Sequence, residues 1–191
     1  MLRRIGFFLL IAASLAVAAC TPAPRALPIA KAQEVSALAE SIRSLGPEVA
    51  RTDAERVAQI AFAYSRQLAF DYQVTDPPLV HNAKVNMGLR PRGLCYHWAD
   101  DLEARLRQED LGSLTLHRAI ANADKRFRIE HSTVIVSRKG DAMIEGIVLD
   151  PWRYGGGLYW SPTLKDERYD WVPRAEVFEM KRRQARRGWA A

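Results

Sequence analysis

Hydrophobic residues recur at helical spacing through the first half of the chain. Residues three and four positions apart lie on one face of a helix, so this spacing predicts amphipathic helices that each bury one face. The first helix is expected to begin near Glu34 and to stop at Gly46 and Pro47. A second is expected after Thr52, which with Glu55 has the spacing of a capping box. Two more helices are predicted over residues 79–87 and 95–108.

The pattern changes beyond Gly112, where short runs rich in β-branched residues are separated by polar segments. Three strands are predicted, over residues 114–120, 131–138 and 143–149. Because helices come first and strands follow, we predict the α+β class, with N-terminal helices packed on an antiparallel sheet. The chain has 191 residues, which suits one domain once a leader is set aside, and this domain is expected over residues 34–191.

The first twenty residues have the pattern of an export signal. Two arginines precede an apolar run that ends in small residues before Cys20, and the run is shorter than a comfortable bilayer span. This ending resembles the bacterial lipoprotein signal, in which the cysteine becomes the lipidated first residue. We therefore predict a signal peptide over residues 1–19, lipidation of Cys20 and a proline-rich tether over residues 20–33. An ordinary signal peptide with an incidental cysteine, or a transmembrane helix, is the alternative.

The residue after Cys20 is Thr21, which is not acidic. In the lipoprotein resemblance this favours an anchor in the bacterial outer membrane, facing the periplasm. The membrane would then be reached through the N-terminal lipid. Charge says less about partners, because the net charge of +6 falls to +4 when residues 1–19 are removed.

Much of the positive excess lies near the C-terminus, in Lys181, Arg182, Arg183, Arg186 and Arg187. Cations suit the C-terminal end of a helix dipole, so a solvated helix end is predicted, with anionic lipid or lipopolysaccharide as the alternative contact. Aromatic residues are not interleaved with these cations, and no nucleic acid is expected as a partner. Two cysteines exclude both a disulfide-rich scaffold and a four-cysteine zinc site, and we expect no metal or cofactor.

Cys95 has no disulfide partner once Cys20 is assigned to lipid, although free thiols are oxidised in such a compartment. It stands in the first turn of a predicted helix, where unpaired N–H groups and the helix dipole favour a thiolate. The simpler alternative is a small buried apolar residue. His97 is expected on the solvated stripe with Asp101 as its partner, and hence to be structural, because one Cys-x-His pair lacks the other ligands of a metal site.

His131 opens a predicted strand and is the expected base. If residues 138–141 form a turn with an even number of loop residues, His131 lies opposite Val148. Asp150 then shares the face of the sheet that His131 occupies, within hydrogen-bonding reach. An odd loop would place the two on opposite faces. Cys95, His131 and Asp150 would then serve as nucleophile, base and orienting carboxylate. Asn86 is a candidate oxyanion donor to an acyl transition state.

Together these segments resemble the transglutaminase-like branch of the papain-like cysteine protease superfamily. The matching stretches are Arg92 to Ala99, Glu130 to Val134, and Val148 to Trp152. One departure is Ser132, where the family often has an aromatic residue after the histidine. The resemblance implies a papain-like core and a nucleophilic Cys95 with His131 as base and Asp150 to orient it.

For function, the resemblance implies a thiol hydrolase that cleaves a peptide or other amide bond. Its substrate would be a peptide or protein, cell-wall peptide included. Three alternatives stay open. They are an NlpC-like cell-wall peptidase, an amine-transferring transglutaminase, and a non-catalytic binding lipoprotein of the same fold.

Overall fold

The computed structural model describes residues 27–188. Its first half contains four helices, α2 (Ala32–Arg43), α3 (Arg51–Asp71), α4 (Pro78–Asn86) and α5 (Cys95–Leu106). All four predicted helices are confirmed, with ends that differ by a few residues. The predicted signal peptide, Cys20 and the tether up to residue 26 lie outside the described residues.

The predicted capping box at the start of α3 is wrong. Helix α3 begins at Arg51, so Thr52 already lies inside the helix. The residue before it, Ala50, makes no side-chain capping bond. The N–H of Ala50 is instead bound by the hydroxyl of Ser113, at 3.0 Å, so a distant part of the chain replaces the local cap.

The second half forms a five-stranded sheet in the order β4-β3-β2-β1-β5, and all of its neighbours are antiparallel. The strands are β1 (Leu114–Ala121), β2 (His131–Arg138), β3 (Ile147–Tyr154), β4 (Gly157–Pro162) and β5 (Val172–Pro173). Short 3-10 turns, η1 (Met143–Glu145) and η2 (Thr163–Lys165), precede β3 and follow β4. The third strand therefore begins later than predicted, because η1 occupies its expected start. The α+β class with an antiparallel sheet is confirmed.

The register between β2 and β3 differs from the expected one. Ile135 pairs with Val148, so His131 does not lie opposite Val148. The cause is the connection, which runs over residues 139–146 and includes η1 instead of a tight turn. Its eight residues are still an even number, and side chains alternate along a strand with a period of two. His131 and Asp150 therefore remain on the same face.

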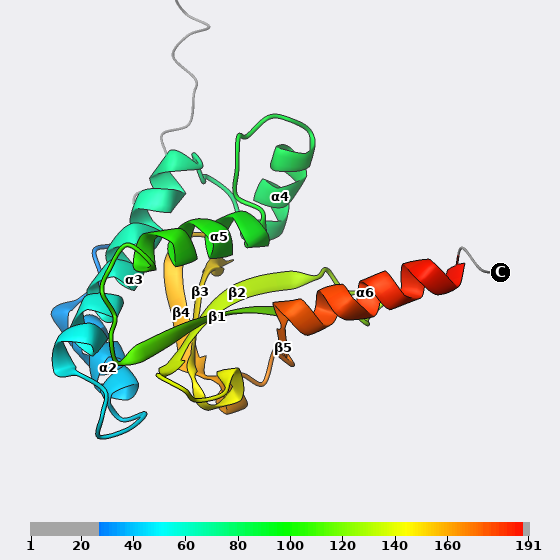
Figure 1. Ribbon diagram of the computed structural model, residues 1–191. Coiled ribbons are helices and arrows are strands. Elements are labelled where there is room, and N and C mark those ends of the chain that lie inside the picture. The colour runs from blue at the N-terminus through cyan, green and yellow to red at the C-terminus, as the bar shows by residue number, and fades with distance from the viewer. Residues whose placement is uncertain (1–26, 189–191) are drawn as a thin grey trace, which may run out of the picture.

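Helices α2, α3 and α5 cover one face of this sheet (Figure 1). Leu102 and Leu106 of α5 are fully buried in one cluster with Val134, Val136 and other apolar residues of the sheet and of α2 and α3. Burying such side chains contributes roughly 1.5–3 kcal/mol each. A smaller cluster, which includes Ile135, covers the opposite face. Cys95 is the first residue of α5, and its thiol contacts the carbonyl oxygen of Glu130, the residue before β2.

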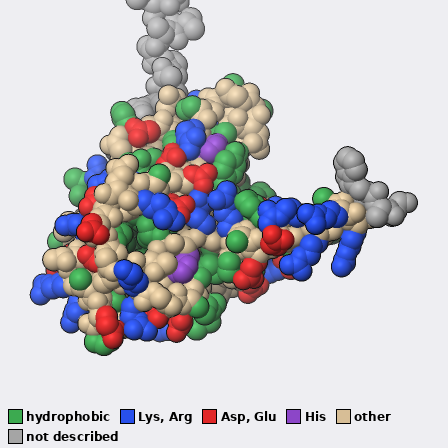
Figure 2. Space-filling model, in the orientation of Figure 1, with side chains coloured by type: hydrophobic (Ala, Val, Ile, Leu, Met, Phe, Trp, Pro, Cys, Tyr) green, Lys and Arg blue, Asp and Glu red, His purple; other side chains and the backbone are tan. Residues whose placement is uncertain are grey.

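The last helix, α6 (Arg174–Gly188), projects from the body of the protein (Figure 1). Its Lys and Arg side chains form a row along the exposed arm (Figure 2), as expected for a solvated helix end. Its first turn, by contrast, contacts the body, where Val177 is buried. Among the described residues, no helix is long and apolar enough to cross a membrane.

Candidate active site

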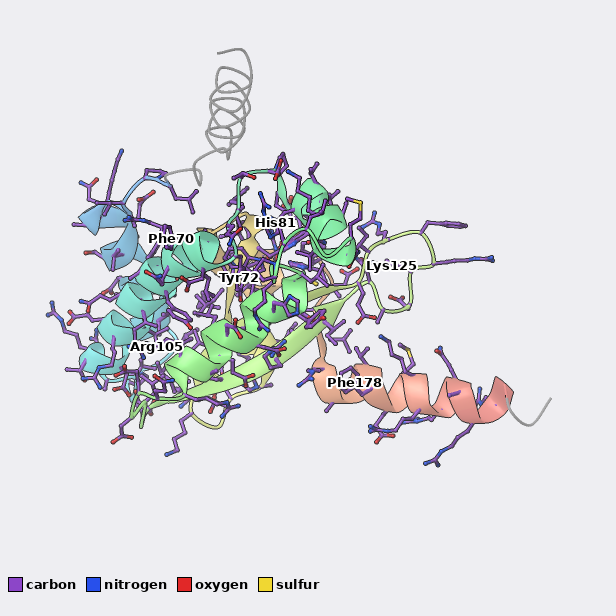
Figure 3. The ribbon with its side chains drawn as sticks, turned by 90° about the horizontal axis from the view of Figure 1, so that it is seen from above. Phe70, Tyr72, His81, Arg105, Lys125 and Phe178 are labelled. Atoms are coloured by element: carbon purple, nitrogen blue, oxygen red, sulfur yellow. The ribbon has the colours of Figure 1, made fainter. Side chains whose placement is uncertain are left out.

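The approach to Cys95 is fixed by Gly93. This residue has φ +127, a conformation that side chains rarely allow. A Cβ atom added at Gly93 would also lie 2.2 Å from Nε2 of His81. His81 is buried on α4 (Figure 3), and its Nε2 is 2.9 Å from the carbonyl oxygen of Arg92. A glycine two residues before the cysteine therefore lets α4 pack directly against the turn that starts α5.

His97 does not pair with Asp101, which corrects the expected contact. Its Nδ1 accepts the backbone N–H groups of Gly93 and Leu94, at 3.2 and 3.3 Å, and so caps the start of α5. Burial, together with the nearby Arg92 charge, lowers the pKa of His97, which keeps the ring neutral and able to accept. Asp101 instead binds the Arg92 guanidinium and the Tyr72 hydroxyl. This arrangement gives His97 a structural contact.

The sulfur of Cys95 lies at the edge of the core. The residue is 8% exposed, and the thiol donates a hydrogen bond to the carbonyl oxygen of Glu130 at 3.5 Å. It packs among buried aromatic side chains that include Trp98 and Trp152. Cys95 forms no disulfide within the described part of the chain, and it contributes to the wall of a surface groove. The thiol is thus both sheltered and reachable.

His131 is held by a short contact on one nitrogen and left open on the other. Its Nε2 lies 2.6 Å from Oδ2 of Asp150. Aromatic rings surround the imidazole, with Trp152 and Tyr169 each 4.6 Å away between centroids. The other nitrogen, Nδ1, is buried and has no hydrogen-bond partner among residues 27–188. A ring in this position can exchange a proton through Nδ1 while Asp150 fixes its tautomer.

The electrostatics favour a charged imidazole at His131. Burial alone would lower its pKa, but the charge and hydrogen bond of Asp150 outweigh burial, with a smaller contribution from the Cys95 thiol. The result is a pKa raised to about 9. The Cys95 thiol contacts the carbonyl oxygen of Glu130, the residue before His131, so the structure brings the three predicted residues close to one another.

Asp150 is itself held by an arginine that sequence reasoning missed. Arg153 donates its backbone N–H to Oδ1 of Asp150 and its Nε to Oδ2, at 3.2 and 3.0 Å. The rest of its guanidinium binds Asp166 at 2.7 and 3.1 Å. All three side chains are buried. The only local signal was the Asp150-x-x-Arg153 spacing, whose meaning depends on an irregularity in β3 between Asp150 and Tyr154.

The groove beside Cys95 has a volume of about 630 Å³. Helix α4 contributes one wall and the start of α6 another. Asn86, the predicted oxyanion donor, lines it together with Asn82. Asn82 is the better oriented of the two, because its Oδ1 accepts the Nε1–H of Trp152 at 3.1 Å. An indole nitrogen only donates, so the amide oxygen of Asn82 must face Trp152, and its NH₂ group is left free to donate elsewhere.

Comparison with known proteins finds no relative of this chain. No family model matches the chain, and neither a curated protein nor a solved structure matches it. Within residues 27–188, no group of three or more His, Cys, Asp or Glu side chains is placed to hold a metal ion.

Folding stability is expected to fall as the pH rises through about 9. The pKa of His131 is raised in the folded protein from 6.5 to about 9, so its stabilising contribution is fully present below about 6.5 and is lost as the pH rises to about 9. Urea unfolding midpoints across this range would measure the loss. In Asp150→Asn the carboxylate charge is gone, and the midpoint should change less with pH. If the urea midpoints of the two proteins change equally with pH, Asp150 is not the cause of the raised pKa of His131.

Proposed function

We propose that the protein is a thiol hydrolase that cleaves a peptide or other amide bond through an acyl-enzyme on Cys95. The observation that carries the proposal is His131, a buried imidazole with Asp150 on Nε2 and, within residues 27–188, no partner on Nδ1. The Cys95 thiol lies beside it, in contact with the carbonyl oxygen of the preceding residue, Glu130. His81 is also buried with an open Nδ1, but its Nε2 contacts a backbone carbonyl oxygen, whereas Nε2 of His131 contacts a carboxylate. Here the open nitrogen belongs to the residue next to a groove that contains a free cysteine.

The chemistry starts from an ion pair in which Nδ1 of His131 holds the proton of the Cys95 thiol. The resulting thiolate attacks the carbonyl carbon of the substrate, a C–S bond forms, and the carbonyl oxygen becomes an oxyanion. The N–H of Cys95, in the unpaired first turn of α5, and the NH₂ of Asn82 are the candidate donors to that oxyanion. Asn86 remains the alternative side-chain donor.

The second half of the cycle returns the proton. His131 donates it to the leaving amine as the C–N bond breaks, which leaves a thioester on Cys95. His131 then takes a proton from water, the water oxygen attacks the thioester, and the carboxylic acid leaves as the thiol is restored. Asp150 holds the ring of His131 in place throughout the cycle and is itself held by Arg153.

The fold and residues are consistent with the transglutaminase-like branch of the papain-like superfamily, to which we assign the protein within this proposal. Helix α5 begins at the cysteine, β2 begins at the histidine, and the carboxylate lies on the neighbouring strand β3. The residues before Ala32 support a lipoprotein anchored in the outer membrane and facing the periplasm, on the sequence pattern alone. Substrates would then be peptides or proteins of that compartment.

Cys95→Ser is expected to abolish product formation from the true substrate. The full chain would be incubated with a library of soluble peptides and, separately, with purified peptidoglycan, and new termini would be read by mass spectrometry. Products that depend on Cys95 from soluble peptides support the proposal. Products from peptidoglycan alone favour the cell-wall peptidase, and products carrying an added amine favour the transglutaminase. No Cys95-dependent product in any arm would contradict catalysis, and His117→Gln is the matched control.

A further inference from the structure

Two arginines stand at the α6 end of the groove, Arg118 from β1 and Arg174 at the start of α6. The side chain of Arg118 is 8% exposed, so it is more than nine-tenths buried. Its Nη1 contacts Asp100 and, at 3.3 Å, Glu103. Its Nε is buried and has no hydrogen-bond partner within residues 27–188.

The Nε side of the Arg118 guanidinium, which has no partner within residues 27–188, is able to bind a carboxylate. A guanidinium binds a carboxylate in a bidentate manner through two adjacent N–H groups in one plane, and the edge formed by Nε and Nη2 offers such a pair. In this structure Asp100 and Glu103 occupy Nη1 only. Because a buried donor without a partner is unfavourable, an acceptor that reaches this edge from the groove would be stabilised there.

The surroundings of Arg118 add positive potential. Arg174 makes no ion pair within the described part of the chain, and its guanidinium lies over the ring of Phe178, 4.8 Å from the centroid (Figure 3 labels this ring). Arg174 also begins the 15-residue helix α6, whose first N–H groups lack intrahelical partners and attract anions.

The acidic residues of the groove are already engaged. Asp100 is paired with Arg118, and the Glu130 carboxylate is paired with Lys181 of α6. Within residues 27–188, the charge left without a partner at this end of the groove is therefore that of Arg174, and Arg118 adds an unpaired N–H. A ligand that completes the site must supply an anionic oxygen.

We propose that the α6 end of the groove is a subsite for a substrate carboxylate, held by Arg118 and Arg174 with the first turn of α6. The carboxylate could come from an acidic side chain or from the end of the substrate chain. The proposal deepens the thiol hydrolase assignment and rests on it for the position of the reacting bond.

Two separations along the backbone indicate how far Arg118 lies from the thiol. Arg118 is two residues along β1 from Ile120, which pairs with Ser132 beside His131, and two residues of a strand span about 7 Å. Asp100, the partner of Arg118, is five residues along α5 from Cys95, a rise of about 7.5 Å. Both distances match roughly two residues of an extended peptide. The carboxylate should therefore lie about two residues from the bond that is cleaved.

Alkylating probes test this subsite without needing the true substrate. Bromoacetyl-leucine would be compared with its amide, and bromoacetyl-glutamic acid α-amide with its glutamine counterpart. In each case the Cys95 thiolate attacks the methylene carbon, the C–S bond forms and bromide leaves. Rates at the peptide containing Cys95 would be followed by mass spectrometry. We expect one acidic probe to react about tenfold faster than its neutral twin, and the pair that shows the preference identifies the source of the carboxylate.

Three variants assign the preference to residues. Arg118→Lys keeps a cation beside Asp100 and Glu103 but removes the open edge, and it should remove most of the preference. Arg174→Gln, at an exposed position that can change without harm to the core, should reduce the preference about threefold. Arg183→Gln on the outer part of α6 is the control and should change nothing.

Equal rates for acidic and neutral probes in the unmodified protein would overturn the subsite, as would a preference that survives in both Arg118→Lys and Arg174→Gln. If Cys95 reacts with no probe, the hydrolase proposal fails. The subsite is then decided by ligand-detected NMR with N-acetyl-leucine and its amide. Preferential binding of the acid that is lost in Arg118→Lys supports it, and equal binding overturns it.

Discussion

Replacing His131 with alanine is expected to slow alkylation of Cys95 by iodoacetamide about 100-fold near pH 6. Alkylation requires a thiolate, and an ordinary thiol is only about 0.3% ionised at that pH. With a pKa of about 9, the imidazole of His131 is protonated there and stabilises the sulfur anion. Without it the thiol should react like that of a free cysteine. The label would be followed on the peptide that contains Cys95, because the sequence also contains Cys20.

The pH dependence separates this effect from unfolding. Near pH 10 the imidazole of His131 has lost its proton, so the rates for the two proteins should converge. Asp150→Asn should give an intermediate rate near pH 6, since the imidazole stays but loses the carboxylate that raises its pKa. His117→Gln is the matched control, because His117 contacts Ser137 on the far part of β2. Equal rates near pH 6 with and without His131 would show that the two residues do not act together.

The contact between His131 and Asp150 was predictable because it depends on whether the number of connecting residues is even or odd, more than on the exact register. The expected pairing of His131 with Val148 is wrong, since the connection between β2 and β3 contains a 3-10 turn that sequence patterns did not reveal. An even number of connecting residues is still enough to put His131 and Asp150 on one face. The helix-start position of Cys95 was equally local, because it depends on the Gly93 turn.

The helices were predictable for a similar reason. Their apolar residues recur every three or four positions, and such residues share one face only in a helix. Leu102 and Leu106 are indeed fully buried. The ends of the helices were harder to predict, because the groups that cap a helix can come from residues far away in the sequence. The start of α3 is an example, where Ser113 supplies the contacts to the N–H of Ala50 and to Asp53.

The support behind Asp150 could not be predicted, because it is assembled from distant segments. Asp166 and Trp171 come from the region between β4 and β5, which shows no strong periodic pattern. Asp166 binds both Arg153 and the indole N–H of Trp171, and Trp171 in turn lies 5.4 Å from the ring of His131. Only the folded arrangement makes a single unit of these residues.

Arg153→Met is expected to destabilise the fold by about 3–5 kcal/mol. The guanidinium is 3% exposed and lies between the carboxylates of Asp150 and Asp166, which are each 1% exposed. Its removal leaves two buried carboxylates, of which Asp166 keeps only neutral donors such as Trp171. A methionine of similar length restores packing but no charge, so the loss reports electrostatics. Urea unfolding at neutral pH would measure it.

Two further variants separate charge from packing. In the Arg153→Met background, Asp166→Asn removes one uncompensated charge and keeps an acceptor for Trp171, so part of the lost stability should return. Arg138→Met is the matched control, since Arg138 also bridges two carboxylates, Asp141 and Glu48, but at the surface where water screens them. It should cause a much smaller loss. If Arg153→Met and Arg138→Met cost the same, the buried bridge does not hold Asp150 in place, and the orientation of His131 must depend on its aromatic neighbours instead.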